Sequence, residues 1–436
     1  MSSHDHGAER EAVPPWFWPL HVFFRSQASG GILLLIATVA ALIWANSPWA
    51  GSYHHVLATP ISFGWGEWLV AMALEHWIND VVMAVFFLAV GLEIKRELLV
   101  GELASWRQAA LPVIAALGGM VVPALLFAVA NAGTPTLRGW AIPTATDIAF
   151  AIGILSLLGS RVPLGLKVFL TALAIADDLG AVVVIAVFYA GHIDAAWLAA
   201  AVAMTLVAWA AGRAGIRHPV AWAGMGILLW VCVHASGVHA TIAGVALAAV
   251  IPAGSAATRR QAELLRDGLQ QNRPDLLTVP VIRQLEHECR SALSPLDRFE
   301  HALRPWVAFV IMPVFALANA GVTVDATTGS AVLSTVTVGI VAGLVLGKPI
   351  GVCLGTYAAI RWCGSSLPSG ATWSSVAAVS LFAGIGFTMS LFVSGLAFAD
   401  QPEAIAQAKL GILIGSAIAG TAGILVFLLS NRGSSS

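Results

Sequence analysis

Long apolar segments recur along the chain from residue 28 onward, and short polar stretches separate them. A helix of about 20 apolar residues crosses the hydrocarbon core of a bilayer, which is roughly 30 Å thick. Because lipid offers no hydrogen bonds to a backbone, segments of this kind must be helical. The pattern predicts twelve membrane-spanning helices, at 28–46, 74–96, 109–130, 139–157, 164–190, 195–212, 219–233, 238–252, 302–320, 332–358, 373–398 and 405–429.

The composition agrees with this pattern. Of the 436 residues, 58% are hydrophobic and only 10% are charged. Soluble domains carry roughly 25% charged residues, so the chain is predicted to be an all-α polytopic membrane protein whose main partner is the lipid bilayer. A net charge of -1 argues against a nucleic-acid partner. The four cysteines form no CxxC pair, so we expect no disulfide, no metal cluster and no cofactor.

The distribution of Lys and Arg predicts the orientation, because cytoplasmic loops are enriched in positive charge. With twelve spans and a cytoplasmic N-terminus, the outer segments hold only Arg138 and Lys409. An error of one span would destroy this alternation. Spans 219–233 and 238–252 have an alternative interpretation as one re-entrant hairpin, but His234 between them favours a turn.

The sequence therefore predicts a cytoplasmic N-terminal tail at 1–27, a transmembrane domain at 28–430 and a cytoplasmic C-terminal tail at 431–436. The start of the chain lacks the charged-then-apolar order of a cleavable signal peptide. Both termini are thus expected on the same side of the membrane.

Two stretches between spans are distinctive. Residues 47–73 mix Pro, Gly, Trp and β-branched residues, which favours an extracytoplasmic hairpin over a plain loop. An exposed hairpin edge can pair with its copy, so we expect a homodimer through 47–73. Residues 254–300 form a predicted long cytoplasmic loop, and its excess of Arg suits the anionic inner leaflet.

Two adjacent aspartates, Asp177 and Asp178, lie in the middle of the apolar segment 164–190. A carboxylate at that depth costs about 2.5 to 3.5 kcal/mol on insertion scales, so such a pair is usually functional. The alternative is a structural pair satisfied by hydroxyl or lysine side chains of neighbouring helices. Consecutive helical residues diverge by about 100°, so each carboxylate must meet a different partner. The pair predicts two connected roles at one site.

Other ionisable side chains lie nearer the ends of spans. Asp80 is near the outer end of the second span, on the expected outer path of the cation. Glu93, Arg96 and Glu97 share one face at the inner end, because positions three and four apart are neighbours on a helix. They predict either an acidic funnel that concentrates cations or an ordinary salt-bridged helix end. His239 has a side chain that titrates near neutral pH, although a lone histidine is more often structural.

Two spans contain residues that interrupt a helix. Pro143 removes a backbone donor in the fourth span, where Thr146 and Asp147 supply oxygen atoms. The segment 383–390 of the eleventh span holds two glycines and two hydroxyl residues, for which close helix packing is the alternative. Spans three to five (109–190) form one triplet and spans ten to twelve (332–429) form another, and each has its interrupted helix in the middle. The two triplets start on opposite sides of the membrane. This pattern is typical of inverted repeats with the binding site between them.

A lysine, Lys348, lies within the tenth span and needs a counter-charge at that depth. The remaining deep carboxylates are Asp147, Asp177 and Asp178. The residues alone leave open which of the three Lys348 faces. A buried ion pair at the site is predicted in each case.

Segments in most of the predicted spans resemble the NhaA-type sodium/proton antiporters. The resemblance implies twelve helices, inverted repeats and two broken helices that cross at mid-membrane, in a bacterial inner (cytoplasmic) membrane. The matching segments are Asn79-Asp80, GLEIKREL (91–98), AIPTATDIAFAIGIL (141–155), ALAIADDLGA (172–181), SGVHATIAG (236–244), LANAG (317–321), GKPIG (347–351) and AGIGFTMSLF (383–392).

The resemblance also implies roles for particular residues. Asp177 and Asp178 correspond to the cation and proton site, and Thr146 and Asp147 to the polar groups at the crossing. Since Asp178 then points toward the cation, Asp177 is the predicted partner of Lys348. The positions linked to the pH response are Glu93, Arg96, Glu97, His239, Glu300 and His301.

The chain departs from the family pattern at two places. Arg304 stands where the resemblance leads us to expect a histidine, and the 254–300 loop is longer than usual. Both departures bear on the pH profile rather than on the transport chemistry.

Together these features predict a secondary active transporter and not an enzyme: an electrogenic, pH-regulated antiporter that extrudes sodium or lithium as protons enter. A buried carboxyl group holds either a proton or, when ionised, a hard monovalent cation. Exchange is electrogenic if more protons than cations bind, and two carboxylates with a lysine permit this. Activity is expected to be low at acidic pH and to rise toward alkaline pH.

Two alternatives belong to other classes. An intramembrane aspartyl protease would share a proton between Asp147 and Asp178, but it leaves Lys348 and Asp177 unexplained. A sodium-coupled symporter for an organic anion would need further polar or Arg groups at mid-depth, and the sequence offers none.

Overall fold

The computed structural model describes residues 29–65, 68–191, 193–253, 294–323 and 328–432. The predicted N-terminal tail at 1–27 lies outside these ranges, as do residues 254–293 of the predicted cytoplasmic loop and 433–436 of the C-terminal tail.

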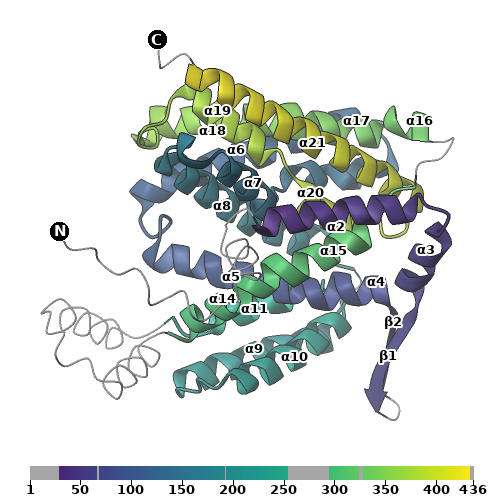
Figure 1. Ribbon diagram of the computed structural model, residues 1–436. Helices are drawn as coiled ribbons and strands as arrows, with labels where there is room; N and C mark the ends of the chain where they lie inside the picture. The colour runs from purple at the N-terminus through teal and green to yellow at the C-terminus, as the bar shows by residue number, and fades with distance from the viewer. Residues whose placement is uncertain (1–28, 66–67, 192, 254–293, 324–327, 433–436) are drawn as a thin grey trace, which may run out of the picture.

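The described chain is mainly helical, with one pair of strands (Figure 1). The first elements are α2 (Ser29–Ala45), α3 (Ala50–Ala58), β1 (Pro60–Trp65), β2 (Trp68–Ala73), α4 (Leu74–Trp77), η1 (Ile78–Val82), α5 (Met83–Val100), α6 (Trp106–Ala130), η2 (Pro135–Thr144), α7 (Ile148–Leu157), η3 (Gly159–Arg161), α8 (Leu164–Phe188) and α9 (Ala195–Arg213). The remaining elements are α10 (Pro219–Ala235), α11 (Ile242–Val250), α14 (Pro295–Trp306), η5 (Val307–Ile311), α15 (Met312–Asn319), α16 (Thr328–Val332), α17 (Thr335–Ala342), η6 (Gly343–Gly347), α18 (Lys348–Cys363), α19 (Trp373–Ala383), α20 (Phe387–Ala397) and α21 (Pro402–Arg432).

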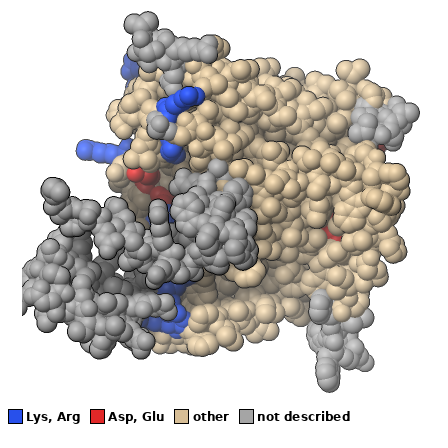
Figure 2. Space-filling view, in the orientation of Figure 1, with Lys and Arg blue, Asp and Glu red and all other residues tan. Residues whose placement is uncertain are grey.

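Within the described residues, 8 helical stretches are long and apolar enough to cross a membrane. The pair α19 and α20 meets the same criterion with a bend of 45° between its halves. The other helices at predicted spans are shorter; α10 has 17 residues and α11 has 9. Each predicted span coincides with a helical segment, which confirms a multi-span all-α architecture. Most of the face in Figure 2 is uncharged, as expected for helices in lipid, and its Lys and Arg atoms gather toward the left end.

Some boundaries differ from the sequence prediction. The helix α14 begins at Pro295, so residues 295–300 are helical and not part of the 254–300 loop. Ser294 explains this start, because its hydroxyl accepts a hydrogen bond from the backbone N–H of Asp297 (3.1 Å). Proline at the first helical position lacks only an N–H that would have had no partner within the helix. The helix α11 is also shorter than its predicted span at 238–252.

The two predicted helix breaks are present and lie against each other. Residues 145–147 separate η2 from α7, and residues 384–386 separate α19 from α20. The backbone N–H of Asp147 donates to the carbonyl of Ile385 at 2.7 Å, which joins the breaks directly. A side chain at Gly386 would stand 3.0 Å from a carbonyl oxygen of the first break, so glycine permits this close approach.

Close packing of α6 against α18 positions the lysine of the site. A Cβ at Gly118 would lie 2.2 Å from the carbonyl oxygen of Gly351, and a Cβ at Gly351 would lie 2.1 Å from that of Gly118. Small residues at such contacts let two membrane helices approach closely. Lys348 is the first residue of α18, so this contact places it deep in the bundle.

An antiparallel pair of strands lies within the predicted hairpin stretch 47–73. Strand β1 pairs with β2 from Pro60↔Ala73 to Trp65↔Trp68, and the hairpin projects from the helices at the lower right of Figure 1. The preceding helix α3 was not predicted; it is held by Tyr53, whose hydroxyl lies 2.9 Å from the carbonyl oxygen of Leu317. The side of the membrane on which the hairpin lies stays a prediction, as does its pairing in a dimer.

Candidate functional site

The deepest charged pair joins α18 to α8. The ammonium nitrogen of Lys348 lies 2.6 Å from Asp177 Oδ2, and neither side chain is exposed (0% for both). Lys348 also donates to the carbonyl of Thr144, at the end of η2. The predicted partner of Lys348 is thus confirmed as Asp177. The π-helical turn η6 immediately precedes this lysine, and turns of this kind are frequent at functional sites.

Asp178 follows Asp177 on α8 but has different surroundings. Its side chain is buried, and its Oδ1 has no hydrogen-bond partner among the described residues. The charged groups acting on it are Asp177, Glu93, Asp147 and Lys348. A buried carboxyl oxygen without a donor is costly, so Asp178 has unused capacity to bind a proton or a cation.

Asp147 holds the two helix breaks together. Its Oδ1 accepts from the backbone N–H of Phe150 in the first turn of α7 (2.9 Å). Its Oδ2 accepts from the backbone N–H of Thr388 in α20 (3.1 Å) and from the hydroxyl of the same threonine. One carboxylate therefore meets the N-termini of two half-helices, where a negative charge is favourable.

Thr146 completes the crossing on the side of Asp177. Its hydroxyl donates to the carbonyl of Ala383 at 2.7 Å, which ties the first break to the end of α19. Thr146 also lies against the carboxylate of Asp177. Thr146 thus adds a hydroxyl oxygen beside the carboxylate of Asp177, and oxygen is the ligand that hard monovalent cations prefer.

A cavity of about 870 Å³ leads toward this site from one end of the bundle. Glu93, Glu97, His301 and Arg304 line it, together with Thr171 of α8. Asp178 lies seven residues beyond Thr171 on the same helix face, about 10 Å further along the axis. Acidic and basic groups thus share the wall of this cavity, and the role of Glu93 and Glu97 as a cation funnel stays a prediction.

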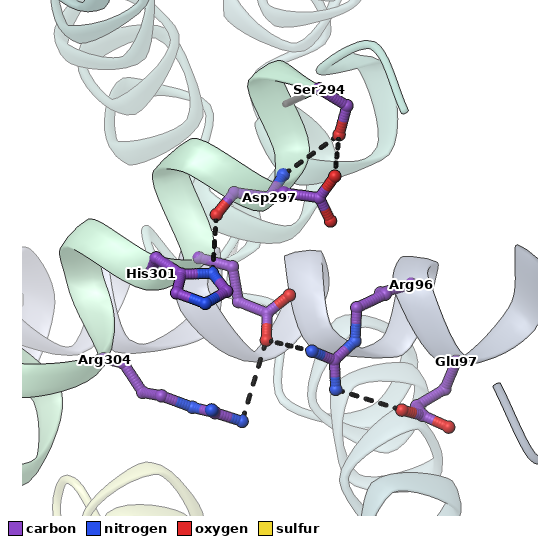
Figure 3. A network of polar contacts seen from close by, with 7 residues as sticks. Arg96, Glu97, Ser294, Asp297, His301 and Arg304 are labelled. Atoms are coloured by element: carbon purple, nitrogen blue, oxygen red, sulfur yellow. Dashed lines mark hydrogen bonds and ion pairs between the residues drawn. The ribbon is translucent and has the colours of Figure 1, made fainter. Parts of the chain in front are cut away.

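A network of ion pairs shares Glu97 and Arg304 with the wall of the cavity (Figure 3). Arg96 lies 2.8 Å from Glu300 of α14 and 3.2 Å from Glu97. Arg304 reaches the same Glu300 at 3.8 Å, although 62% of its side chain is exposed. His301 is one turn beyond Asp297 and lies 3.0 Å from its backbone oxygen through Nδ1. The network joins α5 to α14.

A second polar cluster lies at the other end of α5. Asp80 lies 3.8 Å from His239 Nε2 and 3.6 Å from His234 Nδ1. The ring of His234 also stacks on Trp230 at 5.1 Å. The residues predicted for the outer path and for one part of the pH response therefore lie together, apart from the network around Glu300.

A profile of the Na+/H+ antiporter 1 family matches residues 21–427. The chain belongs to this family. It is 47% identical to the Na(+)/H(+) antiporter NhaA of Oleidesulfovibrio alaskensis over 449 aligned residues, 99% of each chain. It is 46% identical to the Na(+)/H(+) antiporter NhaA of Helicobacter pylori strain G27, over 94% of this chain and 95% of that one. It is 47% identical to the Na(+)/H(+) antiporter NhaA of Albidiferax ferrireducens, over 94% of this chain and 97% of that one.

Membership of the Na+/H+ antiporter 1 family confirms the resemblance drawn from the motifs and identifies the chain as a multi-pass membrane protein. The sequence did not reveal every residue at the site. Thr388 belongs to a predicted break, but its bond to Asp147 depends on the crossing. His234 was interpreted only as part of a turn, because nothing in the sequence places it beside Asp80.

Proposed function

We propose that this chain is a secondary active transporter that exchanges sodium or lithium for protons, and that the two compete at Asp178. The observation that carries the proposal is a buried carboxyl group with a free oxygen beside an ion pair and two crossed helix breaks. The names of the relatives, which extend over nearly the whole chain, support the choice of ions.

The chemistry is a competition for one carboxyl group. Protonated Asp178 is neutral and can remain buried without a partner charge. When the proton leaves, the carboxylate needs a cation, which sodium supplies with help from nearby oxygen atoms. Because proton and cation exclude each other, a rigid movement of the site between the two sides couples their gradients.

Lys348 and Asp177 have a second role in the proposal. Their ion pair is neutral as a whole and lies beside Asp178 without occupying its free oxygen. Protons that bind at the pair as well as at Asp178 would outnumber the single cation that leaves. Exchange is then electrogenic.

Asp147, Thr146 and Thr388 have a positioning role. They fix the crossing through bonds between the two breaks, so the half-helices can move as one body. Both oxygens of Asp147 accept hydrogen bonds from α7 and α20. That engagement speaks against a proton shared with Asp178, as an aspartyl protease would require.

The cavity lined by Glu93 and Glu97 is the proposed cytoplasmic entrance, and Asp80 marks the outer path. Protonation of the network around Glu300 and of His239 is proposed to give a pH-dependent activity. We further propose an inner-membrane location, cytoplasmic termini and a homodimer through the hairpin of β1 and β2.

Everted membrane vesicles loaded with a respiratory proton gradient test the proposed function. Addition of sodium or lithium, without any organic solute, should release the gradient recorded by a pH-sensitive dye. Vesicles that lack the protein provide the control. A response that requires an organic anion would favour a symporter, and no response at any pH would contradict the proposal.

A further inference from the structure

The two ends of the proposed pathway differ in how they are sealed. On the side of Glu93 a cavity reaches into the bundle. On the side of Asp80 the space above the crossing contains packed aromatic rings. Phe392 of α20 is at the centre of this packing and is only 3% exposed.

The contacts of Phe392 bring several elements together. Its ring centroid lies 5.5 Å from Phe87 of α5, 6.3 Å from Phe315 of α15 and 5.3 Å from His239. The rings of His239 and Phe392 meet edge to face at 83°. Tilted and edge-to-face arrangements at these distances are favourable for aromatic pairs. The four rings are called the aromatic cluster below.

The aromatic cluster lies between the crossing and the outer polar groups. Phe392 is one turn beyond Thr388, which binds Asp147, so the two share a face of α20. On the far side of the cluster, His239 lies 3.8 Å from Asp80. Phe87 of α5 is seven residues beyond Asp80, which lies in the π-helical turn η1 just before α5. The cluster thus separates Asp80 from the site.

The partners of Phe392 also belong to a different part of the chain. Phe392 is carried by α20, in the second broken helix, whereas Phe87, Phe315 and His239 belong to segments outside both triplets. A movement of the crossed half-helices relative to α5 and α15 must therefore change these contacts. Closely packed rings leave no room for a hydrated cation. A bare cation among them would lose the solvation of its charge.

We propose that Phe392 is the outer gate of the pathway: its ring closes the route from Asp80 to Asp178 and must leave the aromatic cluster before the site opens outward. The proposal rests on the proposed exchange for its purpose. Its test is the accessibility of the site, which does not require transport.

Thiol labelling from the outside measures this accessibility. Asp178→Cys is made in a chain whose Cys232, Cys289, Cys353 and Cys363 are replaced by serine. A membrane-impermeant, positively charged thiol reagent is then added outside right-side-out vesicles. Adding Phe392→Ala should raise the labelling rate at least about tenfold, because several aromatic contacts of the closed form are lost. Phe392→Leu should give a smaller increase.

The matched control is Phe382→Ala. Phe382 is also buried, but its ring lies against Gly423 of α21 and not in the aromatic cluster. It should leave the labelling rate unchanged. Equal labelling with and without Phe392→Ala would overturn the gate, and so would an equal increase with Phe382→Ala, which would indicate general loosening.

A cross-link tests whether α20 must separate from α5 at the aromatic cluster. Phe87→Cys and Phe392→Cys, joined by a short bifunctional thiol reagent, should reduce exchange in proteoliposomes to background, with recovery on reduction. The control pair, Phe382→Cys with Gly423→Cys, joins α19 to α21 and should leave exchange near its unlinked rate. Exchange at the unlinked rate with the first pair joined would show that the cluster need not open. The parent protein is assayed alongside: if it shows no exchange, the proposed function fails, while the labelling result still decides the gate.

Discussion

The two faces of α8 at its centre carry the same side chain in opposite situations. On one face Asp177 is neutralised by Lys348 at 2.6 Å, and Thr146 lies beside it. On the other face Asp178 forms no ion pair among the described residues, whereas the Oδ1 atoms of both aspartates are buried without a hydrogen-bond partner there. The difference arises because Lys348 of α18 bonds to Asp177 and to the carbonyl of Thr144, and acts on Asp178 only from a greater distance. One aspartate has a partner that belongs to the protein, and the other is available for a partner that comes and goes.

This contrast explains why a single helix needs two adjacent carboxylates. A lone buried aspartate would become charged each time it released its proton, with only a transported ion to balance it. The neighbouring ion pair is neutral as a whole, and Lys348, held in place by the contact of α6 with α18, balances the charge of Asp177 whatever the state of Asp178. The face of Asp177 is therefore expected to contribute mainly to stability, and the face of Asp178 mainly to exchange.

The largest effect is expected from Asp178→Asn. The amide has nearly the same shape but cannot take up a proton or bind a cation as a carboxylate does. Exchange in everted vesicles should fall to the level of vesicles without the protein, while the melting temperature in detergent stays near the parent value. Exchange near the parent rate would remove Asp178 from the mechanism.

Lys348→Ala should lower the stability of the protein through its effect on Asp177. It leaves Asp177 buried without its partner, which costs about 3 to 5 kcal/mol in comparable pairs. Combined with Asp177→Asn, the loss should be smaller than the sum of the two single losses by about 0.5 to 3 kcal/mol. Thermal unfolding of the four proteins gives this cycle. Additive losses would mean that the pair seen at 2.6 Å is not coupled.

Lys348→Arg refines the same comparison. The charge is kept, but the planar guanidinium is not interchangeable with an ammonium. The ammonium is held by Asp177 and by the carbonyl of Thr144, so a longer planar head group must displace at least one of these contacts. Stability should recover only in part relative to Lys348→Ala. Full recovery in thermal unfolding would indicate that the pocket is less constrained than its contacts suggest.

A third effect concerns competition at Asp178. If one proton and one sodium ion exclude each other there, the sodium concentration for half-maximal exchange should rise about tenfold per unit fall in pH, by mass action. Rates measured over a range of sodium at several pH values give this slope. A half-maximal concentration that does not change with pH would mean that the two ions bind at separate places.

The smallest effect is expected from Arg304→His. Arg304 is 62% exposed and lies 3.8 Å from Glu300, and exposed pairs of this kind are weak. The pH profile of exchange should shift by less than about one unit. Glu300 also has Arg96 at 2.8 Å, so Glu300→Gln is the matched change that should shift the profile further. A larger shift from Arg304→His than from Glu300→Gln would contradict this ranking.

The sequence predicted the helices well, because each span must be apolar over the whole thickness of a bilayer. It also located both breaks, since Pro143 and the glycines of 383–390 are costly within a helix. The bond of Asp147 to Thr388 could not be read from either segment, because it depends on how the two breaks cross. The same holds for His234 beside Asp80 and for Phe392 in the aromatic cluster. Ser294 is a local signal for a helix start that was missed. The helix α14 begins directly after it, at Pro295.

Sodium-induced proton release from the purified protein tests the difference between the two faces most directly. In weakly buffered detergent solution at alkaline pH, sodium should release protons from the parent protein and none from Asp178→Asn. Asp177→Asn should still release protons if it folds, because the free oxygen of Asp178 remains. Release that survives Asp178→Asn, or that is lost only with Asp177→Asn, would contradict the assignment of exchange to Asp178.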